Sequence, residues 1–192
     1  KTATITNGTA TIEIEFVNDQ NFTVLFWAQV ARGEGEAAIY NTEDLTNVTY
    51  AGNVLPNSSV YFSNQEDYAA FYAAAFVKDS DSKSKSIKLK RPFAQLNFGA
   101  SRMNSSFGDI TIGATSVTVD GLATVFNTLD GVGTVEAAAP VTFTASGLAS
   151  ITEELVTNSS SYTWITMDYM CMMDDKSTVD VTADFEVTGI GK

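Results

Sequence analysis

The side chains of this sequence that could do chemistry are mainly carboxylates. Three close acidic pairs occur: Glu34 with Glu36, Glu153 with Glu154, and Asp174 with Asp175. A glycosidase needs two carboxyl groups that face each other across a cleft, roughly 5–10 Å apart. Adjacent residues of a strand point to opposite faces, so neighbouring acids on a strand do not converge. We therefore interpret these pairs as solvated surface, with a hydrolase that uses carboxylates alone as an alternative.

Other catalytic residue types are scarce. The 192 residues contain no histidine, and Cys171 is the single cysteine. Without histidine there is no Ser-His-Asp or Cys-His arrangement and no His-ligated zinc. Cys171 lies inside the apolar run 169–173, which is typical of a buried, inert thiol. We expect a protein that is not an enzyme and that holds no cofactor or metal.

The charge balance argues against nucleic acid as a partner. Twenty-three acidic and 11 basic residues give a net charge of −12, which repels phosphate backbones. The one dense basic run consists of Lys83, Lys85, Lys88, Lys90 and Arg91. It has no interleaved aromatic residues on which bases could stack. We interpret it as the solvated face of a strand and its leading loop, with an anion-binding patch as the alternative.

Two tryptophans are candidates for stacking on sugars. Trp27 lies in a continuous apolar stretch, which favours a place in the core. Trp164 alternates with Tyr162 and Thr166 and so has the better pattern for exposure. Trp164 is therefore the predicted ligand-stacking aromatic residue, and burial in the core is its alternative.

The first third of the chain shows strand patterns. Residues 11–16 alternate isoleucine with glutamate, which predicts a half-buried strand. Residues 18–21 have the composition of a turn. Residues 22–30 are almost continuously apolar, so we expect a central strand that is covered on both faces.

One segment predicts a helix. Ser63 and Glu66 have the spacing of a capping box at the start of an alanine-rich run, residues 64–75. Within this run Tyr68, Phe71 and Tyr72 fall on one helical face, which we expect to pack on a sheet.

The remainder of the chain indicates a β-sandwich. Residues 87–99 form a strand pattern that contains Pro92, and because proline cannot donate to a ladder, it indicates an edge, a bulge or a strand break there. Further strands are predicted at 110–112, 116–119, 122–127, 141–145, 162–173 and 178–187. We predict one domain over residues 1–192, all-β and mainly antiparallel. Its expected fold is a transthyretin-like or immunoglobulin-like β-sandwich with one short helix packed on it. No segment approaches the about 20 apolar residues of a membrane-spanning helix.

Three segments together resemble the fimbrillin-like surface proteins of Bacteroides-type bacteria. They are Val24-Leu25-Phe26-Trp27-Ala28, Asp67-Tyr68-Ala69-Ala70-Phe71-Tyr72 and Leu89-Lys90-Arg91-Pro92-Phe93-Ala94-Gln95-Leu96-Asn97. The resemblance implies export as a lipoprotein to the outside of the outer membrane, with attachment through a lipidated N-terminus that this sequence lacks. It also implies transthyretin-like sandwich domains. Some members of that family polymerise into fimbriae by donor-strand exchange after a protease removes an amino-terminal strand.

These expectations lead to two functional hypotheses for a cell-surface protein. The first is a structural or accessory subunit of a fimbria that joins neighbouring subunits by β-strand addition. The second is an adhesin that does not polymerise and binds a glycan or a host protein, with an exposed aromatic platform at one end of the sandwich.

Overall fold

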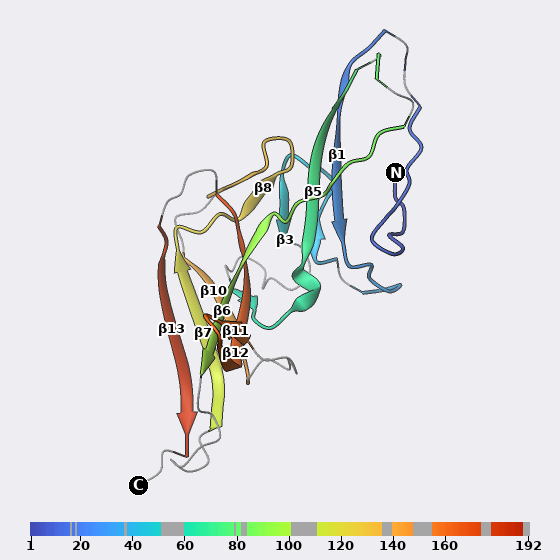
Figure 1. Ribbon diagram of the computed structural model, residues 1–192. Helices are drawn as coiled ribbons and strands as arrows, with labels where there is room; N and C mark the ends of the chain where they lie inside the picture. Colours follow the sequence, from blue (N-terminus) through green and yellow to red (C-terminus); the bar gives the residue numbers. More distant parts are fainter. Residues whose placement is uncertain are drawn as a thin grey trace.

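The computed structural model describes residues 1–15, 17, 19–36, 38–50, 60–78, 80–81, 84–100, 111–135, 140–147, 155–173 and 178–189. The strands of this part are β1 (Phe22–Gln29), β2 (Tyr40–Asn41), β3 (Val48–Tyr50), β4 (Val60–Phe62), β5 (Ala70–Val77), β6 (Phe93–Ala100), β7 (Thr111–Asp120), β8 (Val125–Asn127), β9 (Val132–Thr134), β10 (Val141–Ala145), β11 (Leu155–Thr157), β12 (Ser160–Cys171) and β13 (Asp180–Thr188). A short 3-10 turn, η1 (Glu66–Tyr68), precedes β5 (Figure 1).

The strands form four sheets. Their orders are β13-β7-β10-β4, β11-β12-β6, β2-β3-β8-β9 and the two-stranded ribbon β1-β5. β4 joins β10 in parallel, and the other described pairings between strands are antiparallel. The prediction of an all-β, mainly antiparallel sandwich is therefore confirmed.

The β6-β12 pair lies between two hydrophobic clusters because its alternate residues face opposite ways. Phe93 and Tyr169 enter the first cluster, together with residues of β2, β3 and β8. Leu96 and Met170 pack on the second cluster, whose centre is formed by β7 and β10. The β13-β7-β10-β4 sheet and one face of the β6-β12 pair thus enclose one core. The other core lies between the opposite face of that pair, the β2-β3-β8-β9 sheet and the base of the β1-β5 ribbon.

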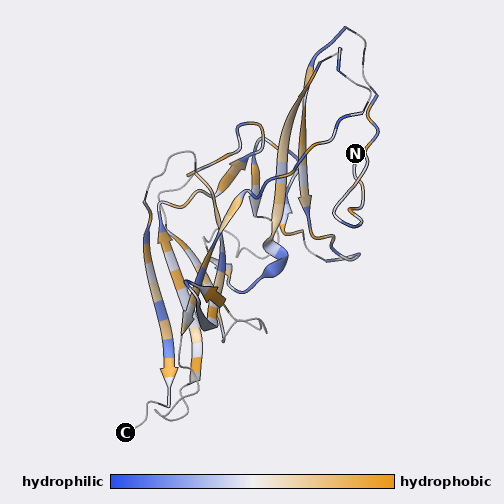
Figure 2. Ribbon diagram, in the orientation of Figure 1, coloured by the Kyte–Doolittle hydropathy of each residue, from blue (hydrophilic) through white to orange (hydrophobic). Residues whose placement is uncertain are grey.

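The apolar segment at 22–30 forms a strand as predicted, but its place in the fold differs from the prediction. β1 pairs with β5 alone in the described residues, and all of its side chains except Thr23 are half-buried. The expectation of a central strand covered on both faces is therefore wrong. The apolar side chains instead serve the two faces of a ribbon whose far end projects from the body, and Figure 2 shows its hydrophobic character.

The predicted helix at 64–75 is also wrong. Only η1 is helical in the described part of that run, and Ala70–Val77 is the strand β5. Ser63 makes no capping bond, because the residue that precedes η1 is Gln65 and it has no side-chain cap. Antiparallel pairing with β1 along the whole of β5 satisfies the backbone of this run and buries Ala73 and Ala75. Tertiary pairing thus overrides the helical spacing of its aromatic residues.

Two strand predictions near the proline and the amino terminus need correction. In residues 11–15 no strand forms, and Ile14 is 39% exposed. In the 87–99 segment the strand begins at Phe93, directly after the buried Pro92, and before it only Lys90 makes an isolated bridge. The strand break predicted at Pro92 is thus confirmed, and the regular strand covers only the part of the segment that follows the proline.

The close approach of β9 to the end of β12 requires a glycine. A Cβ atom on Gly133 would lie 2.6 Å from Cys171 Sγ, 2.7 Å from Ala123 Cβ and 2.7 Å from the Met172 carbonyl oxygen. The Gly133 amide also donates a hydrogen bond of 2.7 Å to that carbonyl. The missing side chain thus allows the β2-β3-β8-β9 sheet to reach the β6-β12 pair.

We expect Gly133→Ala to lower the free energy of unfolding by about 1–3 kcal/mol, because the added methyl group overpacks a closed contact. Gly147→Ala is the matched control, since nothing lies within 4 Å of its added Cβ. That control should change stability by less than about 0.5 kcal/mol. Urea unfolding of both variants measures the difference, and equal effects would contradict this account of the contact.

Candidate functional site

The hydrogen-bond pattern of the β1-β5 ribbon shows which backbone groups point outward. On β5, the Tyr72 amide and carbonyl both bond to Lys90, at 2.8 Å each, on the side away from β1. In an antiparallel pair, residues alternate between bonding to the partner strand and pointing away from it. Tyr72 pairs in register with Trp27, so the backbone N–H and C=O groups of Trp27 must also point away from the partner strand. The bonds between β1 and β5 are therefore made by the residues on either side of these two.

The outer edge of β1 is open. By the same alternation, the outward N–H and C=O groups of β1 belong to four residues. They are Thr23, Leu25, Trp27 and Gln29. In the described residues no second strand pairs with this edge, and no backbone hydrogen bond links these four residues to a segment other than β5. An unpaired row of this kind is a template for another strand.

Aromatic contacts hold the base of the ribbon against the body. The ring of Trp27 lies 5.2 Å from that of Tyr40 and 6.3 Å from that of Phe93, both edge-on. On β5, Tyr72 meets Phe126 edge-on at 4.7 Å. Such contacts contribute beyond the burial of the rings. They fix the direction in which the ribbon leaves the body.

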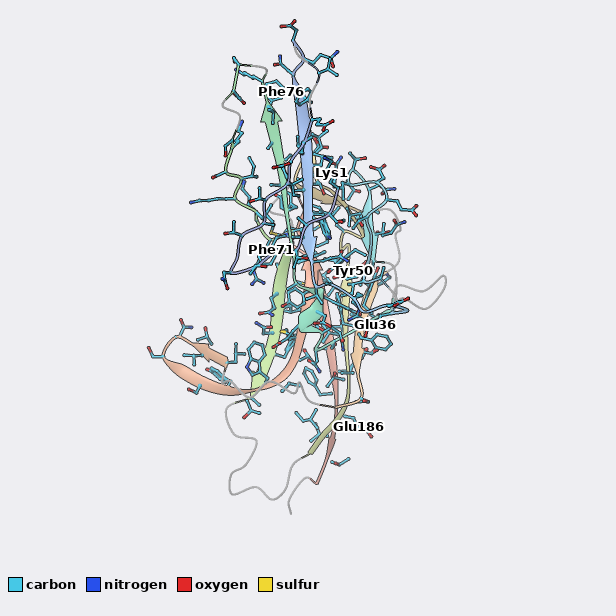
Figure 3. The ribbon with its side chains drawn as sticks, turned by 90° about the vertical axis from the view of Figure 1, so that its right-hand side faces the viewer. Lys1, Glu36, Tyr50, Phe71, Phe76 and Glu186 are labelled. Carbon is cyan, nitrogen blue, oxygen red and sulfur yellow. The ribbon has the colours of Figure 1, made fainter. Side chains whose placement is uncertain are left out.

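The far half of the ribbon is much less covered. Phe76 of β5 is 52% exposed, whereas Ala70 at the base is 2% exposed. Figure 3 shows Phe76 near the tip, with the amino-terminal segment that begins at Lys1 in front of the ribbon. That segment forms only one bridge, between Thr6 and Thr9, and so it adds no ladder to the ribbon in the described residues.

Comparison with known protein families matches almost the whole chain to one family. It belongs to DUF6562. This is a family of unknown function, and the match covers residues 1–190. No curated protein and no solved structure matches the chain.

Trp164, the predicted stacking residue of this DUF6562 chain, lies on β12 and is half-buried against the first hydrophobic cluster. Its indole nitrogen is buried and has no hydrogen-bond partner in the described residues. It lies opposite Gly99 on β6, next to an irregularity in the register. Its role as a ligand-stacking residue stays a prediction.

The acidic pairs are not brought together by the part of the DUF6562 chain that the structure describes. Glu36 is exposed, pairs with Arg32 at 3.7 Å and accepts a hydrogen bond from the Gly33 amide. The pairs at 153–154 and 174–175 lie outside the described residues. Within the described residues, no three His, Cys, Asp or Glu side chains gather as metal ligands, and no helix is long and apolar enough to cross a membrane.

The thiol of Cys171 is buried, as predicted, and burial raises its pKa to about 12. Since the thiolate is the nucleophilic form, this environment suppresses reactivity. Its packing against Gly133 makes it part of the contact between two sheets.

Sequence reasoning missed a buried carboxylate. Asp168 on β12 is 1% exposed, and its Oδ2 accepts a hydrogen bond of 3.1 Å from the hydroxyl of Thr166. Its Oδ1 and the hydroxyl of Ser63 are both buried without a partner in the described residues. Burial raises the pKa of the Asp168 carboxyl, and the hydrogen bond from the hydroxyl of Thr166 offsets part of that rise. The alternation of β12 shows no sign of it, because a single acid in a strand normally faces solvent.

The raised pKa of Asp168 determines whether its contribution to stability rises or falls with pH. The folded state holds the proton more tightly than the unfolded state, so the contribution of Asp168 to stability falls as pH rises from about 3.9 through the folded-state pKa. Asp168→Asn removes the buried charge and keeps an acceptor for Thr166. We expect the variant to be more stable than the wild type at pH 7, with a difference that shrinks as pH falls toward 4.

Urea unfolding at several pH values between 4 and 8 measures this difference. Taking the difference between variant and wild type cancels the titration of the other acidic residues. A wild type that exceeds the variant at pH 7 would contradict the assignment of an unfavourable buried charge.

Proposed function

We propose that this DUF6562 protein is a structural or accessory subunit of a bacterial surface fimbria that accepts a β-strand from a neighbouring subunit at the outer edge of β1. The observation that carries the proposal is the open row of backbone groups on Thr23, Leu25, Trp27 and Gln29. An added strand would satisfy these donors and acceptors at once. The resemblance of three sequence segments to fimbrillin-like proteins supports the same role.

The stability of a two-stranded ribbon favours the addition. An isolated pair of strands is marginal in water, and a third strand with an apolar face supplies what it lacks. The contacts of Trp27 stabilise only the base of the ribbon. Toward the tip, Leu25 of β1 is only half-buried, so an incoming strand beside β1 would bury apolar surface there. Burial of that kind is worth about 25 cal/mol per Å².

β1 also lacks the features that protect edge strands. Such strands commonly carry charges, prolines or bulges, which prevent pairing with other chains. β1 contains no charged residue and no proline, and its pairing with β5 has no register shift. β13 is an edge strand of the four-stranded sheet and shows the contrast. It carries the exposed Asp180, Asp184 and Glu186, and its register shifts after Phe185. The chain thus protects one edge and leaves the other available.

The outward N–H of Leu25 allows a test that spares the ribbon. We expect Leu25→Pro to abolish filament assembly through the edge of β1, since it removes an outward donor and places a ring on the edge while it keeps the β1-β5 bonds. Leu25→Val keeps the donor and is the matched control. Val24→Pro removes a bond to β5 and should lower stability instead.

Electron microscopy and sedimentation velocity of the three variants and the wild type measure assembly, and urea unfolding measures stability. The proposal predicts filaments for the wild type and Leu25→Val, and no filaments for Leu25→Pro, whose edge of β1 is blocked. Association of Leu25→Pro equal to that of Leu25→Val would refute the use of this edge, and a wild type that stays monomeric would refute subunit addition.

A further inference from the structure

The opposite edge of the ribbon, on β5, is bordered by a lysine-rich strap, residues 84–90. The strap is fixed at two points. At one, the backbone of Lys90 bonds to Tyr72, and at the other, Lys85 Nζ donates a hydrogen bond of 2.8 Å to the Phe76 carbonyl oxygen. Between these points lies a cleft of about 300 Å³, which Ala73, Ala74 and Ala75 line on one side and residues of the strap on the other.

The backbone N–H and C=O groups of Ala74 point into this cleft. The backbone groups of Tyr72 point away from β1, so the backbone groups of Ala74 and Phe76 do the same, because the ladder alternates. In the described residues the backbone of Ala74 has no hydrogen-bond partner on this side. Its side chain is small and exposed. Another backbone can therefore approach Ala74 closely and bond to it as Lys90 bonds to Tyr72.

The strap supplies positive charge beside this position. Lys88 and Lys90 are exposed, line the cleft and form no ion pair in the described residues. Lys85, in contrast, is already paired with Asp81 at 3.0 Å. The chain as a whole has a net charge of −12, so this is a local reversal of sign. A segment that fits the cleft must be extended and acidic.

The chain itself contains such a segment. Thr11–Glu15 has the alternation of a strand, but no strand forms there. Glu13 and Glu15 are exposed and form no ion pair among the described residues. They are two residues apart, as Lys88 and Lys90 are, and two residues of an extended chain span about 6.5 Å. The two acids thus match the two lysines in both sign and spacing.

We propose that residues 11–15 of one copy dock as a short strand in the cleft between β5 and the strap of a second copy. Glu13 and Glu15 pair with Lys88 and Lys90, and the strand backbone bonds to Ala74. Docking within one chain is disfavoured by direction. Residues 11–15 lead to the tip of the ribbon, where Phe22 pairs with Val77, so beside β5 they would run parallel to it. Parallel pairing is the less stable form, and a second copy is free to approach antiparallel.

This inference goes beyond the proposed function and does not rest on it. It concerns the edge of β5 rather than the edge of β1, and it requires only that two copies meet. The Leu25→Pro variant separates the two proposals, because it blocks the edge of β1 and leaves the cleft unchanged.

Charge reversal tests the docking. Sedimentation equilibrium of Leu25→Pro chains that comprise all 192 residues measures self-association through the cleft. We expect Lys88→Glu with Lys90→Glu, or Glu13→Lys with Glu15→Lys, to weaken it by about tenfold or more, since facing charges of like sign repel strongly. Combining all four substitutions keeps the net charge at −12 and should restore association. Asp180→Lys with Asp184→Lys is the matched control on exposed acids of β13 and should not weaken it.

A cysteine pair distinguishes docking between chains from docking within one. Oxidation of a mixture of Glu13→Cys and Lys88→Cys chains should give a disulfide-linked dimer of the two. A single chain that carries both Glu13→Cys and Lys88→Cys should likewise form the disulfide between copies. The proposal is overturned if that disulfide forms only within one chain, if chains with the wild-type cleft do not self-associate, or if the variant with all four charge reversals does not regain association.

Discussion

The contact between the aromatic side chains at the base of the ribbon and the body determines what the rest of the molecule can do. Trp27 and Tyr72 lie opposite each other in the ladder and both meet Phe126, at 6.1 and 4.7 Å between ring centroids. A two-stranded ribbon has little stability of its own in water. Because this contact holds one end, the other end can project, with the edge of β1 open in the described residues and the edge of β5 bordered by the strap.

The two edges of the ribbon differ in chemistry although they belong to one ladder. The edge of β1 is uncharged, so in the proposed function it would select a partner by backbone pairing and by burial of side chains. The edge of β5 carries the cleft, lined by Lys88 and Lys90, which form no ion pair among the described residues, so it would select by charge. Electrostatic selection adds specificity more than affinity, whereas main-chain pairing supplies affinity. Together the edges can give a subunit one strong contact and one that specifies orientation.

Sequence patterns predicted the fold class and most strands because period-two alternation separates the two faces of a strand, as in β13, where Ala183 and Phe185 are half-buried and Asp184 and Glu186 are exposed. They failed where pairing decides the outcome. The alanine-rich run of β5 has helical spacing, yet pairing with β1 makes it a strand. Residues 11–15 have strand spacing but no described partner. The open edge of β1 could not be predicted either, since a continuous apolar run does not reveal how many neighbours a strand has. Nor does any pattern indicate that Asp168 is buried.

Amide hydrogen exchange, resolved residue by residue along β1, tests the central claim most directly. In the free subunit we predict fast exchange at Leu25 and Trp27 and slow exchange at Val24 and Phe26, because only the latter pair bonds to β5. In the assembled form the two fast amides should become protected. Uniform protection along β1 in the free subunit, or fast amides that stay fast on assembly, would contradict an open edge that receives a neighbour's strand.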